Sequence, residues 1–321
     1  MTQPLYLALD YGGTKHSAAL LQPGACAWAA HARVQSPSGA DAAYDQATML
    51  RMARELMARV PGRLAGVGVS FGGPVDARRG VVRLSHHIPG WEETPLRELL
   101  AQEFGAPAAV DNDGNVAALG EWRYGAGRGC ASLLYVTVST GVGGGWVLGG
   151  EILGGADGMA GEIGHMVVRP DGAQCPCGKR GCVEVEACGT AIARMARQQL
   201  AAEPEAGAGL RALAGGSPES VTGALVAAAA AAGDALAEQV LDRAAANLGA
   251  GLGAAICLMN PERIVLGGGV TKAGDRWWAE VRRAASENGF PQARVDIMPA
   301  ALGDDAPLWG AAALAESAAT G

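Results

Sequence analysis

One histidine and three cysteines are spaced like the ligands of a metal ion. His165 is followed by Cys175, Cys177 and Cys182, the cysteines falling within CPCGKRGC. Three thiolates and one imidazole match a closed, tetrahedral Cys3His zinc site, which leaves no position for a substrate. Two glycines let this short loop fold around a single ion. We expect structural zinc in the loop 165–184, with free thiols as the alternative.

Two glutamates flank the predicted zinc ligands. Glu162 lies three residues before His165, and Glu184 two residues after Cys182. A metal loop would hold both carboxylates in place, and such carboxylates suit a ligand that carries many hydroxyl groups. The alternative is that they are solvated surface charges.

Three glycine-rich turns each follow an apolar segment: DYGGTK at 10–15, STGVGGG at 139–145 and GGG at 267–269. Successive backbone N–H groups in such turns bind anions, and the third turn suits a flat adenine or a ribose. No GxxxxGK[ST] motif occurs, and Trp146 replaces the third glycine of a dinucleotide fingerprint. The candidate phosphate and nucleotide contacts are Gly12, Gly13, Thr14, Lys15, Thr140, Gly141, Gly267 and Gly268, and Asp10 could face a metal ion.

Asp113 occurs in VDNDGN, between a predicted strand and a predicted helix. An aspartate at this place can cap the helix. It can equally serve as a general base, because α/β enzymes place their chemistry at strand ends. Both interpretations stay open on the residues alone.

The elements that position these residues follow from hydrophobic periodicity and turn residues. The chain restarts its strand–glycine turn–strand pattern near residue 132, which predicts a duplicated α/β lobe with a cleft between the copies. Residues 202–218 are expected to be a loop. Expected strands are 4–10, 16–21, 26–34, 66–70, 81–85, 107–111, 132–138, 144–148, 263–266 and 294–298, and expected helices are 42–60, 95–104, 219–231, 234–258, 274–287 and one from about 307.

Composition indicates a globular enzyme of two lobes: 321 residues, 49% hydrophobic and 18% charged. The net charge of −7 and the lack of a basic block argue against a nucleic-acid-binding face. Neither a signal peptide nor a membrane span is expected. Seven cysteines, an odd number, fit a cytoplasmic protein whose crowded thiols bind metal. We expect the remaining histidines, at 16, 31, 86 and 87, to be ordinary residues, and Cys26, Cys130, Cys188 and Cys257 to be small buried hydrophobes.

Taken together and in order, these segments resemble the ROK family of bacterial sugar kinases and sugar-responsive repressors. The most specific pair is GEIGH with CxCGxxGCxE, and the likeness covers nearly the whole chain. It rests on DYGGTK at 10–15, GVSFGGPVD at 68–76, DNDGNVAALGE at 111–121, VSTGVGGG at 138–145, AGEIGH at 160–165, CPCGKRGCVE at 175–184, NPERIVLGGGV at 260–270 and LGDDAPLWGAA at 302–312.

The resemblance implies an actin-like, ribonuclease-H-like duplicated fold, with ATP, Mg2+ and a sugar in a central cleft. The small lobe would be 1–118 plus a C-terminal helix at about 305–321, and the large lobe 119–304. Asp113 matches the family's catalytic base, and the glycine turns match its ATP-binding loops. The sugar-binding positions correspond to Gly73, Asn112, Asp113, Glu162, His165 and Glu184.

The motifs disagree about the sugar. DNDGN resembles animal N-acetylmannosamine kinase domains, and Asp111 and Gly114 stand where many members have Glu and Ala. YVTVSTGVGGG resembles bacterial glucokinases. The simplest expectation is an ATP-dependent glucokinase, and the alternatives are an N-acetylmannosamine or other hexose or hexosamine kinase. A sugar-responsive regulator lacking its DNA-binding domain is less favoured, and the family resemblance suggests a homodimer.

Overall fold

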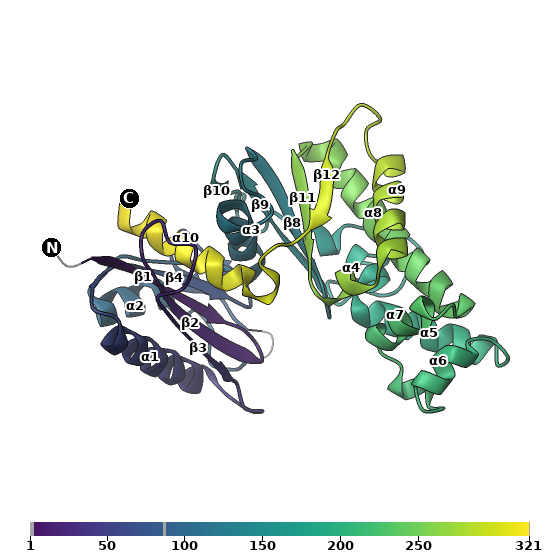
Figure 1. Ribbon diagram of the computed structural model, residues 1–321, viewed down its shortest axis with the longest axis horizontal. Coiled ribbons are helices and arrows are strands. Elements are labelled where there is room, and N and C mark those ends of the chain that lie inside the picture. The colour runs from purple at the N-terminus through teal and green to yellow at the C-terminus, as the bar shows by residue number, and fades with distance from the viewer. Residues whose placement is uncertain (1–2, 86–87, 321) are drawn as a thin grey trace. The chain divides into compact units, whose positions relative to one another are not determined.

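A computed structural model describes residues 3–85 and 88–320 (Figure 1). The chain divides into two compact units. Unit 1 comprises Met1–Tyr135, Gly145–Gly161 and Ala300–Gly321, and unit 2 comprises Val136–Gly144 and Glu162–Pro299. The expected lobe boundary at residue 118 falls inside helix α3 (Asp113–Tyr124), all of which belongs to unit 1. His86 and His87 lie outside the described residues.

The first sheet has the strand order β3-β2-β1-β4-β7. β2 runs antiparallel to β1 and to β3, whereas β4 runs parallel to β1 and to β7. The carboxyl ends of β1, β4 and β7 therefore lie at one edge. The strands are β1 (Pro4–Tyr11), β2 (Lys15–Leu21), β3 (Ala30–Gln35), β4 (Arg63–Phe71) and β7 (Ala108–Asn112), with the short pair β5 (Val75–Asp76) and β6 (Val81–Val82) nearby in sequence.

Helices cover both faces of this sheet (Figure 1). On one face, α1 (Ala42–Arg59) and α2 (Leu96–Phe104) bury a core that includes Met49, Leu56 and Trp91. On the other face, α10 (Ala306–Thr320) and α3 enclose a second core with β1 and β2. Asp41 starts α1 by accepting a hydrogen bond from the Tyr44 N–H.

Glycines let α10 approach its neighbours closely. A Cβ on Gly68 would overlap the carbonyl of Ala311, and one on Gly120 would overlap that of Ala306. A Cβ on Gly310 would overlap the carbonyl of Val116 in α3. The last helix of the chain therefore packs backbone to backbone against β4 and α3.

The second sheet has the order β10-β9-β8-β11-β12, which repeats the pattern of the first: an antiparallel edge strand, a hairpin, then strands contributed by later segments. The predicted duplication is confirmed. The strands are β8 (Ser132–Val138), β9 (Val142–Leu148), β10 (Glu151–Ile152), β11 (Arg263–Gly267) and β12 (Asp296–Pro299).

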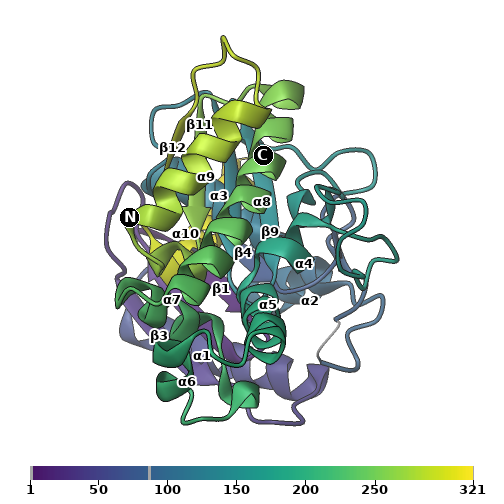
Figure 2. The same ribbon diagram turned by 90° about the vertical axis from the view of Figure 1, so that its right-hand side faces the viewer.

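Long helices α8 (Ala235–Met259) and α9 (Asp275–Asn288) lie side by side in unit 2 (Figure 2). Their close approach uses Gly249 and Gly253, whose added Cβ atoms would lie within 2.7 Å of Ala284 and Asn288. This close packing offsets the low helix propensity of glycine. The other helical elements are η1 (Ile163–His165), α4 (Val183–Ala187), α5 (Gly189–Ala202), α6 (Ala208–Leu213), η2 (Pro218–Ser220), α7 (Gly223–Ala231), η3 (Gly269–Lys272) and η4 (Gly303–Asp305).

Some local expectations are wrong. The expected loop 202–218 contains the helix α6. A tertiary contact stabilises this helix, since Asp234 accepts a hydrogen bond from the Leu210 N–H at 3.0 Å. The strand expected over 26–34 begins at Ala30, and that over 81–85 is only two residues long. Cys26 and Cys257 are exposed rather than buried.

Among the described residues, no single helix is long and apolar enough to cross a membrane. Only α7 and α8 taken together reach that length and apolarity, and they are bent by 119°.

Candidate functional site

Polar side chains line up across the carboxyl edge of the first sheet. Asp10 of β1 is in register with Ser70 of β4, and Ser70 with Asp111 of β7. One residue further on, Phe71 is in register with Asn112, directly before α3. Such an edge is where open α/β sheets bind their ligands.

Asp10 is a buried carboxylate with one side-chain donor. Its Oδ1 accepts a hydrogen bond from the Ser70 hydroxyl at 2.8 Å, and the side chain is almost fully buried. Burial, together with the charge of Asp113, raises the pKa of Asp10 to about 6, although the bond from Ser70 opposes the rise. A cation beside this carboxylate would favour its charged form.

The sequence left two roles open for Asp113, helix cap and general base, and the structure shows which residue caps α3. Asn112 is the cap, since its Oδ1 accepts a hydrogen bond from the Gly114 N–H at 2.9 Å. Its Nδ2 donates to the Gly73 carbonyl at 3.1 Å. Asp113 is the first helical residue and is exposed, with Oδ1 also 2.9 Å from the Gly114 nitrogen. The helix thus has its cap without Asp113.

The turn of Gly12, Gly13 and Thr14 joins β1 to β2 in the same unit. The Gly12 N–H donates to the Lys15 carbonyl at 3.1 Å, and a Cβ on Gly12 would lie 2.8 Å from that oxygen. Glycine is therefore required for the turn to close. Gly13 and Thr14 are exposed, and the Lys15 ammonium lies 4.0 Å from Asp304.

The corresponding turn of unit 2, residues 139–142, is held by the segment that follows the cysteine loop. Glu184 accepts a hydrogen bond from the Val142 N–H at 3.0 Å. The Gly189 N–H donates to the Ser139 carbonyl at 2.7 Å, and the Thr190 hydroxyl donates to the Thr140 carbonyl at 2.9 Å. Thr140 itself is exposed at the tip.

Gly267 and Gly268 end β11 beside the end of β8. Gly268 has a φ of 89°, and a Cβ there would overlap the backbone of Val138. Its carbonyl accepts a hydrogen bond from the Thr271 hydroxyl at 2.7 Å. Glycine at 268 thus allows two strand ends of unit 2 to approach closely.

A cavity of about 820 Å³ opens next to these two turns, within unit 2. Ser139, Thr140 and Gly269 line one part of it, and the first turn of α5 contributes Thr190. Four alanines of α7, apolar residues of α5 and α8, and residues 270 and 272–274 line much of the rest. The volume lies within the usual range for small-molecule sites, roughly 300–1,000 Å³.

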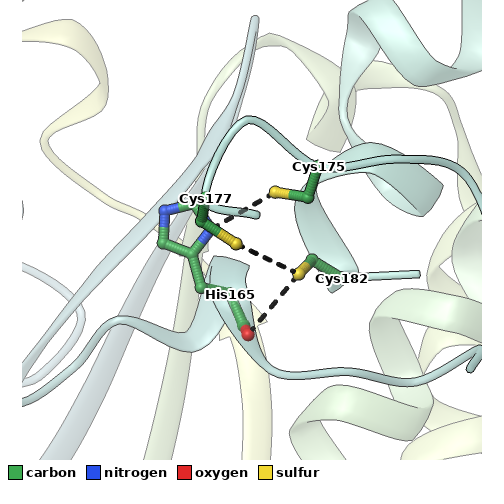
Figure 3. A group of neighbouring side chains, drawn as sticks. All are labelled: His165, Cys175, Cys177 and Cys182. Atoms are coloured by element: carbon green, nitrogen blue, oxygen red, sulfur yellow. Dashed lines mark hydrogen bonds between the residues drawn. The ribbon is translucent and has the colours of Figure 1, made fainter. Parts of the chain in front are cut away.

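The four predicted zinc ligands come together (Figure 3). Their ligand atoms all lie within 4.8 Å of one another. Cys177 Sγ lies 3.7 Å from Cys182 Sγ, and Cys175 Sγ lies 3.7 Å from His165 Nδ1. Zn–S bonds of about 2.3 Å in a tetrahedron separate sulfur atoms by about 3.8 Å, so the donor set fits this ion.

The pKa values of the cysteine thiols also support a zinc ion at this site. Burial and the neighbouring thiols raise the pKa of Cys182 to about 12, and burial raises that of Cys175. Thiols so close together ionise together only beside a cation. The other ring nitrogen of His165, Nε2, lies 4.0 Å from Glu162 Oε2, the kind of partner that orients a metal-bound imidazole.

The sequence interpretation missed two kinds of residue. Ser70, which bonds to Asp10, is a single polar residue inside an apolar strand, and Asn115, which donates to Asp111 at 3.1 Å, belongs to the VDNDGN motif but was given no role. The cavity wall was also missed, because its alanines belong to a helix without an apolar stripe.

The family model for the ROK family matches residues 6–318. The chain belongs to the ROK family. The predicted membership and the actin-like, two-lobe α/β fold are both confirmed.

Proteins similar to this chain include sugar kinases and xylose repressors. A glucokinase from Streptomyces coelicolor is 34% identical, covering 97% of each chain. A kanosamine kinase from Amycolatopsis mediterranei is 32% identical, over 100% of this chain and 99% of that one. A solved ROK glucokinase from Streptomyces griseus, in complex with glucose and AMPPNP, is 33% identical over 98% of this chain and 99% of that chain, with a TM-score of 0.79.

Proposed function

We propose that this chain is an ATP-dependent hexose kinase whose substrate is glucose and whose product is glucose 6-phosphate. The observation that carries the proposal is the exposed Asp113 carboxylate, at the strand edge beside Asn112 and in the same unit as Asp10. The likeness to glucokinases over almost the whole chain supports this reaction class.

Asp113 is the general base. It takes the proton of a sugar hydroxyl while that oxygen attacks the γ-phosphorus of ATP, and ADP leaves. Because Asn112 caps α3, the helix does not depend on the Asp113 carboxylate for its cap. Asn112 and the Gly73 backbone, linked by a hydrogen bond, contact the sugar from the same unit.

Glu162, His165 and Glu184 of unit 2 complete the sugar contacts. Carboxylates accept hydrogen bonds from two sugar hydroxyls at once, which orients the ring. Zinc held by His165 and the three cysteines supplies a rigid frame for them, with no part in the transfer. The 4.0 Å separation of His165 Nε2 and Glu162 supports this common frame.

The glycine turns bind the phosphates of ATP. Backbone N–H groups at Gly12–Lys15 and at Thr140–Gly141 neutralise phosphate charge without a basic patch. Asp10 would hold Mg2+, which neutralises charge on the transferred group. The nucleoside occupies the 820 Å³ cavity, and Gly267 and Gly268 directly precede Gly269 in its wall.

We further infer a cytoplasmic homodimer. The seven cysteines are all free of disulfides, which fits a reducing compartment. The dimer follows from the family resemblance, and light scattering on the purified protein tests it.

The reaction is tested by a screen for sugar-dependent ADP release over glucose, mannose, fructose, allose, kanosamine, N-acetylglucosamine and N-acetylmannosamine. We expect the highest kcat/KM with glucose. A higher value with another sugar reassigns the substrate within the kinase class. Absence of ADP release with every sugar contradicts the kinase proposal.

A further inference from the structure

The nucleoside cavity of unit 2 has almost no means of recognising adenine. Its wall is built largely from small apolar side chains of α5, α7 and α8, with hydroxyl groups gathered near the 139–140 turn. The apolar part consists of Ile192, Ala193, Val221, Ala224, Ala227, Ala228, Ala231, Leu241, Val270 and Ala273. Among the described residues that line the cavity, none has a carboxylate or an amide side chain.

Three backbone carbonyls of residues that line the cavity already accept hydrogen bonds from the protein. The Val221 carbonyl accepts a hydrogen bond from Arg197 at 2.6 Å, and the Thr140 carbonyl accepts one from Thr190. The Ala228 carbonyl accepts one from the Ala232 N–H at 3.2 Å, within the helical pattern of α7. Thr222 caps α7 through the Leu225 N–H. Few acceptors therefore remain for the 6-amino group of adenine.

The charged side chains at the cavity, Arg197 and Lys272, can only donate hydrogen bonds. They cannot accept one from the adenine amino group. They are equally compatible with the 6-oxo group of guanine or hypoxanthine, and with the N7 atom that all three purines share.

We propose that the phosphoryl donor site does not select adenine over the other purine bases, so that ATP, GTP and ITP all serve as donors. This inference rests on the proposed kinase function. An apolar pocket rejects a polar isostere by only about 100-fold, whereas a site built on base hydrogen bonds rejects the wrong base by about 10⁴-fold or more. GTP and ITP are therefore donors for the same sugar.

The first experiment measures kcat/KM for ATP, GTP, ITP and inorganic tripolyphosphate with saturating sugar. We expect GTP and ITP within about 100-fold of ATP. Tripolyphosphate, which lacks the nucleoside, should be more than about 100-fold poorer than ATP, because it leaves the cavity empty. A larger loss with GTP and ITP, or tripolyphosphate as good as ATP, overturns the proposal. Failure of ATP itself would instead contradict the kinase function.

A cavity-filling variant tests where the base binds. Ala228 is exposed on α7 and lines the cavity, so Ala228→Phe should raise the KM of ATP and of GTP alike, by about tenfold or more, with the sugar KM little changed. Ala232→Phe, one turn further and outside the cavity wall, is the matched control and should leave both donors unaffected. A variant that impairs only one of the two purines, or neither, contradicts a shared apolar site.

Discussion

Asp113 and its neighbour Asn112 divide two tasks that one residue could have performed. Asn112 caps α3, and Asp113 follows it as an exposed first helical residue. A capping role can be filled by Asn or Asp alike, whereas proton acceptance needs a carboxylate. The chemistry of Asp113 can therefore be separated from its structural contribution by changing one atom.

We expect Asp113→Asn to lower kcat by roughly 10²–10⁴-fold with the sugar KM and the melting temperature near wild type. Steady-state kinetics and thermal unfolding measure this. The control is Asp41→Asn, which changes a true aspartate cap on α1 and should leave kcat unaltered. Retention of more than about a tenth of kcat in Asp113→Asn would reject the base, and Asp111 would become the candidate.

Asp10 is a buried carboxylate whose charge lowers the stability of the folded protein. Its raised pKa means that the folded state keeps the proton up to about pH 6, while the unfolded chain releases it near the ordinary aspartate pKa of 3.8. Between these pH values unfolding releases a proton, so stability falls as pH rises. Above about pH 6 the folded protein carries the full cost of the buried charge.

We therefore expect Asp10→Asn to be more stable than wild type at pH 7.5 by about 1–3 kcal/mol in the absence of Mg2+, and kinase activity to be lost. The gain should shrink as the pH falls from about 6 to below 3.8, where both states of wild type are protonated. Urea unfolding at several pH values measures it, with the exposed Asp157→Asn as control. A variant less stable than wild type at pH 7.5 would contradict the burial argument.

The cysteine loop is an element whose effect extends to the neighbouring turn. Through Glu184, Gly189 and Thr190 the segment after the loop holds the 139–142 turn by three hydrogen bonds. Loss of the metal should thus disturb phosphate binding as well as sugar binding.

We expect the purified protein to contain about one zinc per chain. Cys177→Ser should lose the zinc, lower the melting temperature and raise the KM of both sugar and ATP. Elemental analysis and kinetics check this. Cys26→Ser, which alters an exposed cysteine outside the cluster, is the control. A zinc-free wild-type protein with full activity would disprove the structural role.

The crossing of α10 and α3 depends on Gly310. Replacing glycine by alanine inside a helix is normally favourable by about 1 kcal/mol. Here the added methyl group would overlap the Val116 carbonyl, and overpacking costs about 1–3 kcal/mol or more. We expect the destabilising overlap to outweigh the gain in helix propensity, because backbone atoms of both α10 and α3 must move.

We expect Gly310→Ala to lower the free energy of unfolding, as measured by denaturant titration. Ser317→Ala, on an exposed part of the same helix, should leave it almost unchanged. If Gly310→Ala is as stable as wild type, α3 and α10 can move apart at a lower energetic cost than their close contact indicates.

At the scale of the whole molecule, the duplication was predictable because the same strand–turn–strand signal occurs twice. Motif residues such as Asp10 and His165 were predictable because their types and spacing are unusual. Ser70 was not, since a lone serine in a buried strand carries no signal until β1 and β4 pair. The cavity was missed because an alanine-rich helix looks the same whether it faces solvent, a core or a ligand.

Net charge gives a prediction for the whole chain. With 25 basic and 32 acidic residues and no basic block, it should form no sequence-specific DNA complex in mobility-shift assays near physiological salt. A shift at nanomolar protein would favour the regulator alternative, since specific sites are typically bound at about 10⁻⁸–10⁻¹¹ M.

The placement of α10 sets the order in which the protein can be made. Unit 1 needs residues 306–320 to cover one face of its first sheet, but the ribosome synthesises them after every other element of that unit. At about 5–20 residues per second, the stretch from Tyr135 to the end of α10 takes roughly 10–40 s to emerge. Throughout that interval the apolar face formed by Ala8, Ala19 and Leu21 lacks its covering helix. We therefore expect nascent chains to bind chaperones until α10 has emerged, and a chain that lacks only α10 to be prone to aggregation.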